Sequence, residues 1–143
     1  MDRPLEIEIL KDPSHELQED LWQRLHEASV ARLQPSDPQQ THSLAMVAKR
    51  GHEIRAGLLA LAYFGGMNLQ CLWVHEEERG NGLASRLLEA IESRSRELGC
   101  NIIWGHTFGF EARGFYLKKG YVEFAALPEY PPGYGCSFMK KNL

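Results

Sequence analysis

The chain has 143 residues, of which 43% are hydrophobic and 24% charged, and its formal net charge at pH 7 is -3. This length fits one domain with its own core, and the composition is typical of a globular protein rather than a disordered or fibrous one. Because 19 acidic residues outnumber 16 basic ones, the sequence indicates no nucleic-acid partner. We expect a single domain over residues 1–143.

The three cysteines, at positions 71, 100 and 136, are widely spaced and contain no C-x-x-C pair. An odd, sparse set argues against a disulfide framework and a structural zinc site, and it suits a reducing compartment. The first ten residues lack the apolar run of a signal peptide, and the longest apolar stretch, residues 56–64, is too short to cross a bilayer. These features predict a cytoplasmic protein without a metal or a membrane partner.

The N-terminal region begins with a strand-like pattern. Residues 5–10 alternate apolar and acidic side chains, which is the two-residue period of a half-buried strand. Helix-start residues at 12–14 precede apolar side chains at helical spacing over residues 17–33. Residues 34–43 contain two prolines and no apolar residue, so we expect a loop that helps to line a substrate pocket.

Three strand-like runs follow, over residues 43–50, 54–64 and 67–75. Their separators are short enough only for hairpins, which predicts an antiparallel meander. A helix with one apolar face then runs from Ala84 to Leu98 and is closed by Gly99, and a strand follows over residues 101–108.

A strand, a helix and another strand form a crossover unit, whose two strands lie parallel. The chain continues with a short helix over residues 111–120 and strands over 121–127 and 134–141. This order predicts an α/β domain with a mixed sheet.

Two glycines stand at the junction between the third strand and the long helix, in the segment Arg79 to Ser85, RGNGLAS. They either only allow the chain to reverse, or shape a cup of backbone N–H groups that binds an anion at the positive end of the helix. A dinucleotide fingerprint would need a glycine at Ser85, and a P-loop would need a lysine after the glycines. The sequence has neither, and a pyrophosphate would fit the cup, with Arg79 adding charge.

The segment Arg79-Gly80-Asn81-Gly82-Leu83-Ala84 matches, at each defined position, the R/Q-x-x-G-x-G/A motif that binds the pyrophosphate of coenzyme A (CoA) in the GNAT superfamily of N-acetyltransferases. Residues 114–121, GFYLKKGY, resemble the tyrosine-bearing helix of that family. The order of elements from residue 43 onward is similar to its fold, and residues 5–33 resemble it more loosely. The resemblance implies a GNAT-type, mostly antiparallel central sheet flanked by helices, with the β-α-β crossover carrying the CoA site.

The resemblance also implies a reaction, in which the acetyl group of acetyl-CoA passes directly to a primary amine of a small molecule or peptide. Tyr116 matches the tyrosine that commonly acts as general acid on the leaving thiolate, although a tyrosine here can also serve only packing. The strand end and the turn are expected to bind acetyl-CoA through Leu72, Trp73, Val74, Arg79, Gly80, Asn81, Gly82, Leu83, Ala84 and Ser85.

The general base stays open. Some relatives use a glutamate on the fourth strand, where this chain has Asn68 and Gln70. The candidates are a water relay and the side chains of His75, His106, Glu111 and Glu129. The run Glu76–Glu78 is interpreted as a solvated rim of the turn, because adjacent carboxylates would repel a phosphate.

Further alternatives concern the loop before the last strand, the chemistry of Cys71 and the function of the whole chain. Residues 127–135 either wall an acceptor pocket or form only a stiff hairpin. A route through an acyl-cysteine at Cys71 is disfavoured because no histidine partner is evident. A non-catalytic acyl-CoA-binding or sensing domain is the alternative function. The acceptor amine and a homodimer are left undecided by the sequence.

Overall fold

The computed structural model of the protein describes residues 2–143, and its contacts divide the chain into two compact units between Asp37 and Pro38. A single domain over the whole chain therefore stays a prediction. No helix in residues 2–143 is long and apolar enough to span a membrane.

The first unit contains helix α1 (His15–Val30). Ser14 caps this helix, since its side-chain oxygen accepts a hydrogen bond from the backbone N–H of Leu17 at 3.1 Å and satisfies a donor that has no partner within the helix. Within residues 15–30 no side chain is buried. The Ser14 cap and the helical spacing of the apolar residues thus agree with the observed start and extent of α1.

The strand expected over residues 5–10 is not formed, and this expectation was wrong. Leu5, Ile7 and Ile9 are 101%, 98% and 94% exposed, and residues 5–10 belong to none of the strand pairs among the described residues. Alternation supplies one apolar face, but a strand also needs a neighbour for its backbone hydrogen bonds.

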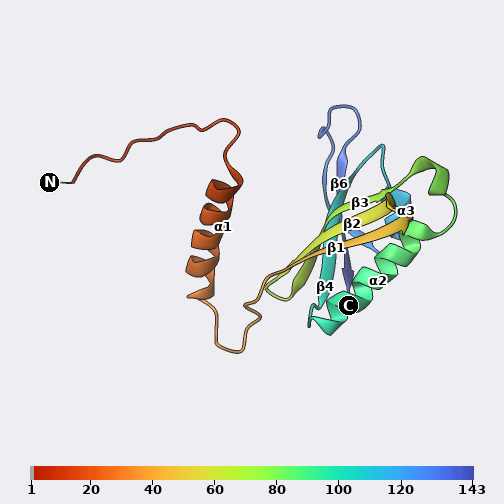
Figure 1. Ribbon diagram of the computed structural model, residues 1–143, viewed down its shortest axis with the longest axis horizontal. Coiled ribbons are helices and arrows are strands. Elements are labelled where there is room, and N and C mark those ends of the chain that lie inside the picture. The colour runs from red at the N-terminus through yellow and green to blue at the C-terminus, as the bar shows by residue number, and fades with distance from the viewer. Residues whose placement is uncertain (1) are drawn as a thin grey trace. The chain divides into compact units, whose positions relative to one another are not determined.

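The second unit is built on a six-stranded sheet in the order β1-β2-β3-β4-β6-β5 (Figure 1). Only β3 and β4 pair in parallel, so the predicted meander, crossover and mostly antiparallel sheet are confirmed. The strands are β1 (His42–Arg50), β2 (Glu53–Tyr63), β3 (Gly66–Val74), β4 (Ile102–Phe108), β5 (Val122–Leu127) and β6 (Cys136–Asn142).

One face of this sheet is covered by the crossover helix α2 (Leu83–Glu97). Leu87, Leu88 and Ile91 are buried on it and belong to one core cluster with alternate residues of β2 and β3. Burying each such side chain contributes about 1.5–3 kcal/mol. Gly99 ends the helix at φ 79°, a left-handed conformation that glycine adopts without strain.

The short helix α3 (Arg113–Lys118) lies on the same face of the sheet, because Phe115 and Tyr116 pack against the same core. Its first turn is held by Thr107 at the end of β4, whose buried hydroxyl accepts a hydrogen bond from the Ala112 N–H at 3.1 Å. Tyr116 is thereby fixed to the end of β4.

A buried ion pair joins α2 to β6. Lys141 Nζ lies 3.1 Å from each carboxylate oxygen of Glu92 and donates to the Lys119 carbonyl at 3.0 Å. The Tyr121 hydroxyl donates to Glu92 at 3.4 Å, and burial, followed by the charge of Glu92, raises the pKa of Tyr121. The charge of Glu92 is thus neutralised inside the core.

Candidate active site

The central strands β3 and β4 pair along only part of their length. Parallel pairing runs from Gly66 with Ile102 to Leu69 with Gly105 and ends there. At this point the β2–β3 register skips Gln70, which leaves a bulge in β3. We call the diverging ends, residues 70–74 of β3 and 106–108 of β4, the fork.

Gly105 stands at the last pair before the fork. A Cβ atom on this residue would lie 2.8 Å from the Leu69 carbonyl oxygen and 3.1 Å from the Leu69 Cβ, closer than packed atoms approach. Gly105 was not among the predicted site residues. An isolated glycine within a strand pattern was the available signal, since it often marks a bulge or a close backbone approach.

The predicted glycine turn leads from η1 (Glu76–Glu78), the single helical turn after β3, into α2. Gly80 and Gly82 have φ of 82° and 75°, and Gly82 is the N-terminal cap of α2. A Cβ on either glycine would have no described heavy atom within 4 Å. The turn is therefore open at the helix end, where the N–H groups of residues 83–85 have no partner within the helix.

Arg79 links the turn to the fork, because its Nε donates to the Val74 carbonyl at 3.2 Å. The backbone of Leu72, Trp73 and Val74 pairs with β2 on one side, and its other side faces the fork. An extended arm can therefore pair with residues 72–74 as an added strand would.

The sequence had suggested that the acidic run beside the turn is a solvated rim, but the run is only partly solvated. Glu78 is 14% exposed and accepts from Arg55 Nε at 3.1 Å, and Glu77 pairs with Arg55 Nη2 at 2.6 Å. The buried Arg55 lowers the pKa of Glu77, and its own pKa is raised by its carboxylate partners. Two of the three charges that would repel a phosphate are thus neutralised.

Tyr116 lies in a less polar environment near the fork. Burial raises the pKa of Tyr116 to about 12, with smaller effects from Glu111 and Cys71. The Tyr116 hydroxyl is therefore a protonated donor at neutral pH. Its helix is tied to the end of β4, because the Tyr116 N–H donates to the Ala112 carbonyl at 3.2 Å and the Ala112 N–H donates to the Thr107 hydroxyl at 3.1 Å.

The candidate bases differ in position. His75 Nδ1 accepts from the Glu77 N–H at 3.1 Å and so caps the turn after β3. His106 lies in the fork, with its ring 5.4 Å from that of Phe108 and 5.8 Å from that of Phe138. Glu129 lies in the β5–β6 loop, and Glu111 is the carboxylate that acts on Tyr116.

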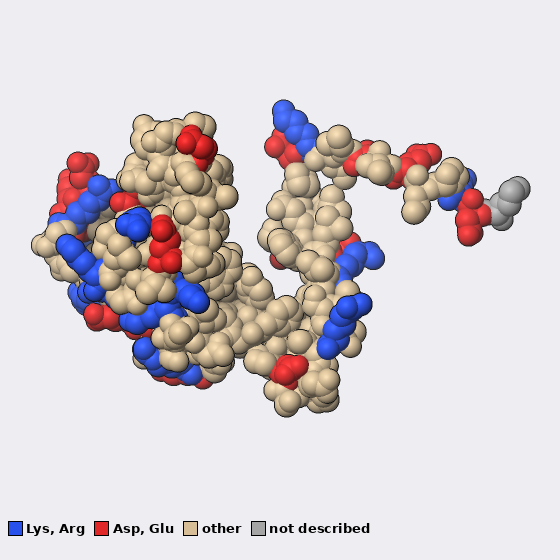
Figure 2. Space-filling model, turned by 180° about the vertical axis from the view of Figure 1, so that it is seen from behind, with Lys and Arg blue, Asp and Glu red and all other residues tan. Residues whose placement is uncertain are grey.

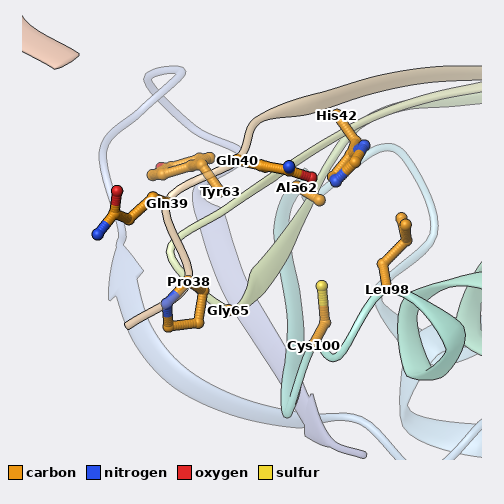
Figure 3. Close-up of a pocket in the computed structure, with 9 residues that line it drawn as sticks. All are labelled: Pro38, Gln39, Gln40, His42, Ala62, Tyr63, Gly65, Leu98 and Cys100. Atoms are coloured by element: carbon orange, nitrogen blue, oxygen red, sulfur yellow. The ribbon is translucent and has the colours of Figure 1, made fainter. Parts of the chain in front are cut away.

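A cavity of about 220 Å³ lies elsewhere, beside the β2–β3 turn and the end of α2 (Figure 3). It is lined by Pro38, Gln39, Gln40, His42, Ala62, Tyr63, Gly65, Leu98 and Cys100. His42 pairs with Ala62, at the end of the sheet away from the fork. Residues 38–42, expected to help line a substrate pocket, are thus not brought to the fork. Residues 2–143 contain no cluster of three or more His, Cys, Asp or Glu side chains that could hold a metal.

Comparison with known proteins identifies similar chains. A model of the acetyltransferase (GNAT) domain matches residues 41–123. Blasticidin-S acetyltransferase of Streptomyces morookaense is 36% identical over 107 residues, which are 74% of this chain and 78% of that protein. Acetyltransferase Atu2258 of Agrobacterium fabrum is 25% identical over 115 residues, 80% of this chain and 82% of the relative. A crystal structure of an acetyltransferase from Bacillus cereus is 28% identical, with a TM-score of 0.81, and the match covers 95% of this chain and 98% of that one.

Proposed function

The chain belongs to the GNAT acetyltransferase family, and we propose that it transfers the acetyl group of acetyl-CoA to the primary amine of a small molecule. It is an acetyl-CoA-dependent acetyltransferase. The similarity to blasticidin-S acetyltransferase supports a small molecule rather than a peptide as acceptor. A cytoplasmic location remains a prediction from the sequence.

The fork is the observation that carries the proposal. It opens at the end of β4, to which the helix of Tyr116 is tied through Ala112 and Thr107, and Arg79 connects it to the open glycine turn at the N-terminus of α2. We assign the pyrophosphate to the N–H groups of this turn, where the helix dipole favours an anion. The residues assigned to the phosphates are Arg79, Gly80, Asn81, Gly82, Leu83, Ala84 and Ser85.

The backbone of Leu72, Trp73 and Val74 is assigned to the pantetheine arm and the thioester carbonyl. Backbone N–H groups at fixed positions stabilise the negative charge that forms on a carbonyl oxygen under attack. The arm would fill the edge of β3 that lost its partner beyond Leu69. This arrangement explains how one strand can serve both the core, through its side chains, and the substrate, through its backbone.

Tyr116 is assigned the role of donor to the departing sulfur. With a pKa of about 12 it would lose its proton to a solvated thiolate of pKa about 8.5 at a cost of about 5 kcal/mol. A thiolate formed in the fork is itself desolvated, which raises its pKa and lowers this cost. The neutral amine nitrogen attacks the thioester carbon, the C–S bond breaks, and the sulfur takes the Tyr116 proton. The second proton, which the nitrogen loses as it becomes an amide, returns to Tyr116 through water.

We assign Glu111 as the group that takes the proton from the incoming ammonium, through a water molecule. It directly precedes Ala112, whose N–H donates to Thr107 at the end of β4, so it stands in the short loop between the fork and the helix of Tyr116. An alkylamine with a pKa of about 10 is almost wholly charged at neutral pH and must lose a proton before it can attack.

The test measures CoA release and N-acetylated product, by mass, with aromatic and aliphatic amines, a polyamine, an aminosugar and a peptide with a free N-terminus. The wild type should acetylate at least one small amine, and Tyr116→Phe should lower kcat about tenfold or more while acetyl-CoA affinity changes little. Tyr63→Phe, which removes a hydroxyl beside the start of β3, away from the fork, should behave as wild type. Tight CoA binding with no product from any small amine would refute the proposal.

A further inference from the structure

Aromatic side chains from two segments meet at the outer end of β4. The Phe108 ring lies 5.7 Å from that of Phe110 and 5.4 Å from that of Tyr130, and the Phe110 ring lies 5.2 Å from that of Tyr134. We call these four residues the aromatic wall. It combines the end of β4 and the residues after it with the β5–β6 loop.

The wall is held together by a close backbone contact. The Gly109 N–H donates to the Gly135 carbonyl at 2.9 Å, and a Cβ on residue 109 would lie only 2.3 Å from the Tyr134 carbonyl oxygen. Only glycine at position 109 permits this approach. The two segments that carry the rings are therefore held side by side before any ligand binds, which reduces the entropy lost on binding.

The rings also remain accessible. Phe110, Tyr130 and Tyr134 are 61%, 56% and 64% exposed, although side chains of this size usually bury most of their surface. Mutually packed rings that still face solvent offer ring faces and edges to a further ring. Scattered exposed aromatic residues would not provide such a surface.

The wall adjoins the fork on the side away from the crossover helix. Thr107 is buried toward α3, and side chains alternate along a strand, so His106 and Phe108 point to the opposite face of the sheet. The glycine turn belongs to the α2 side. A thioester that enters the fork from the turn would thus meet an acceptor held on the wall.

The charge around the wall favours a cation. Residues 106–112 and 128–136 contain Glu111 and Glu129 and no lysine or arginine. In Figure 2 the end of the second unit that projects beyond the sheet, where the β5–β6 loop lies in Figure 1, shows acidic atoms and no basic ones. Exposed aromatic faces attract ammonium groups as well, so charge and rings act in the same direction.

We propose that the acceptor is a primary amine carried on a flat aromatic or heteroaromatic ring by a short linker. The ring stacks on the aromatic wall, mainly on Phe110 and Tyr134, and the ammonium group points toward Glu111, in the loop that follows the fork strand β4. This inference rests on the proposed amine acetylation and specifies its substrate class. A polycationic aminosugar would need more carboxylates than these two segments provide.

The experiment compares tryptamine with n-hexylamine, two primary amines of similar basicity that differ in the flat ring. The wild type should prefer tryptamine by about tenfold or more in kcat/KM, the scale of an added aromatic contact. Phe110→Leu and Tyr134→Leu should each reduce this preference several-fold, because the lost ring contact affects tryptamine more than hexylamine. A wild type without this preference, or unchanged preferences in both variants, would overturn the proposal.

Tyr63→Leu provides the matched control, since it removes an exposed aromatic ring at the β2–β3 turn and should leave the preference unchanged. Thermal unfolding of each variant checks that it is folded. Equilibrium binding of both amines to the CoA-saturated protein separates the two proposals. Tighter binding of tryptamine that is lost in Phe110→Leu, without any acetylation, would retain the aromatic site and refute amine acetylation. Equal binding of both amines would refute the aromatic site.

Discussion

Gly105 of β4 lies against Leu69 of β3 so closely that a Cβ atom on residue 105 would be 2.8 Å from the Leu69 carbonyl oxygen. The two residues form the last parallel pair before the strands diverge. The position of the fork is thus set by a residue without a side chain.

Gly105→Ala should therefore lower the free energy of unfolding by about 1–3 kcal/mol, because backbone atoms must move to admit the methyl group. It should also lower kcat/KM, since the same movement displaces one arm of the fork. Gly57→Ala in β2 is the control, because its Cβ would lie 3.4 Å from the Met46 carbonyl oxygen, an ordinary contact. Urea unfolding and steady-state kinetics measure both effects. Equal stability and activity in the two variants would contradict the role of Gly105.

Gly82→Ala tests the phosphate cup against a glycine of the same backbone conformation. Gly82 and Gly99 have φ of 75° and 79°, and a Cβ on either would have no described heavy atom within 4 Å, so alanine should cost about 1–2 kcal/mol of stability at either site. Only Gly82→Ala should weaken CoA binding, by about tenfold or more, because its methyl group would occupy the space assigned to the phosphate. Calorimetric titration with CoA measures the affinities. Unchanged affinity in Gly82→Ala would rule out the cup.

The raised pKa of Tyr116 predicts a specific response to alkaline pH. The folded pKa of about 12 exceeds the ordinary value of 10.0, so the folded state keeps a proton that the unfolded state loses. This contribution to stability is complete below pH 10 and is lost as the pH rises toward 12, by about 2–3 kcal/mol.

Between pH 10 and pH 12 the unfolding free energy of the wild type should therefore fall more than that of Tyr116→Phe. Tyrosinate absorbance, compared between the two proteins, should assign the change to Tyr116. Deprotonation of Tyr116 should not lower kcat below pH 10. A fall in kcat near pH 9 that Tyr116→Phe abolishes would contradict the raised pKa.

The Glu92–Lys141 pair should respond asymmetrically to substitution. Lys141→Met leaves the buried carboxylate of Glu92 without its cation and should cost about 3 kcal/mol or more. Glu92→Leu should cost less, because the partly exposed Lys141 can still reach water and the Lys119 carbonyl. The double variant should recover much of the loss in urea unfolding at pH 7. Additive single effects would show that the pair is not coupled.

Much of the second unit could be predicted from the sequence because its signals are local. Short separators require antiparallel neighbours, and a helix between two strands requires a parallel pair. The positive φ of Gly80 and Gly82 likewise agrees with a turn that only glycine forms easily. The prediction of a strand over residues 5–10 was wrong because it, too, used only a local signal. An alternating pattern does not show whether a partner strand is present.

The acidic run and the aromatic wall show what local patterns miss. Glu77 and Glu78 stand next to a glycine turn in the sequence, yet Arg55, more than twenty residues earlier, determines their environment. The need for glycine at position 109 becomes visible only in the structure, where the backbone of Tyr134, in the β5–β6 loop, lies against it.

The sequence by itself determined the family resemblance, the glycine turn at Arg79–Ala84 and most of the order of the elements along the chain, because these follow from residue types at short, fixed spacing. The tertiary structure alone decided where β3 and β4 part, that Tyr116 packs against the core beside the end of β4, and that four aromatic rings gather at the end of β4 beside the fork. These features depend on distances between residues far apart in the chain, and such distances are set by packing of the whole sheet rather than by any one segment.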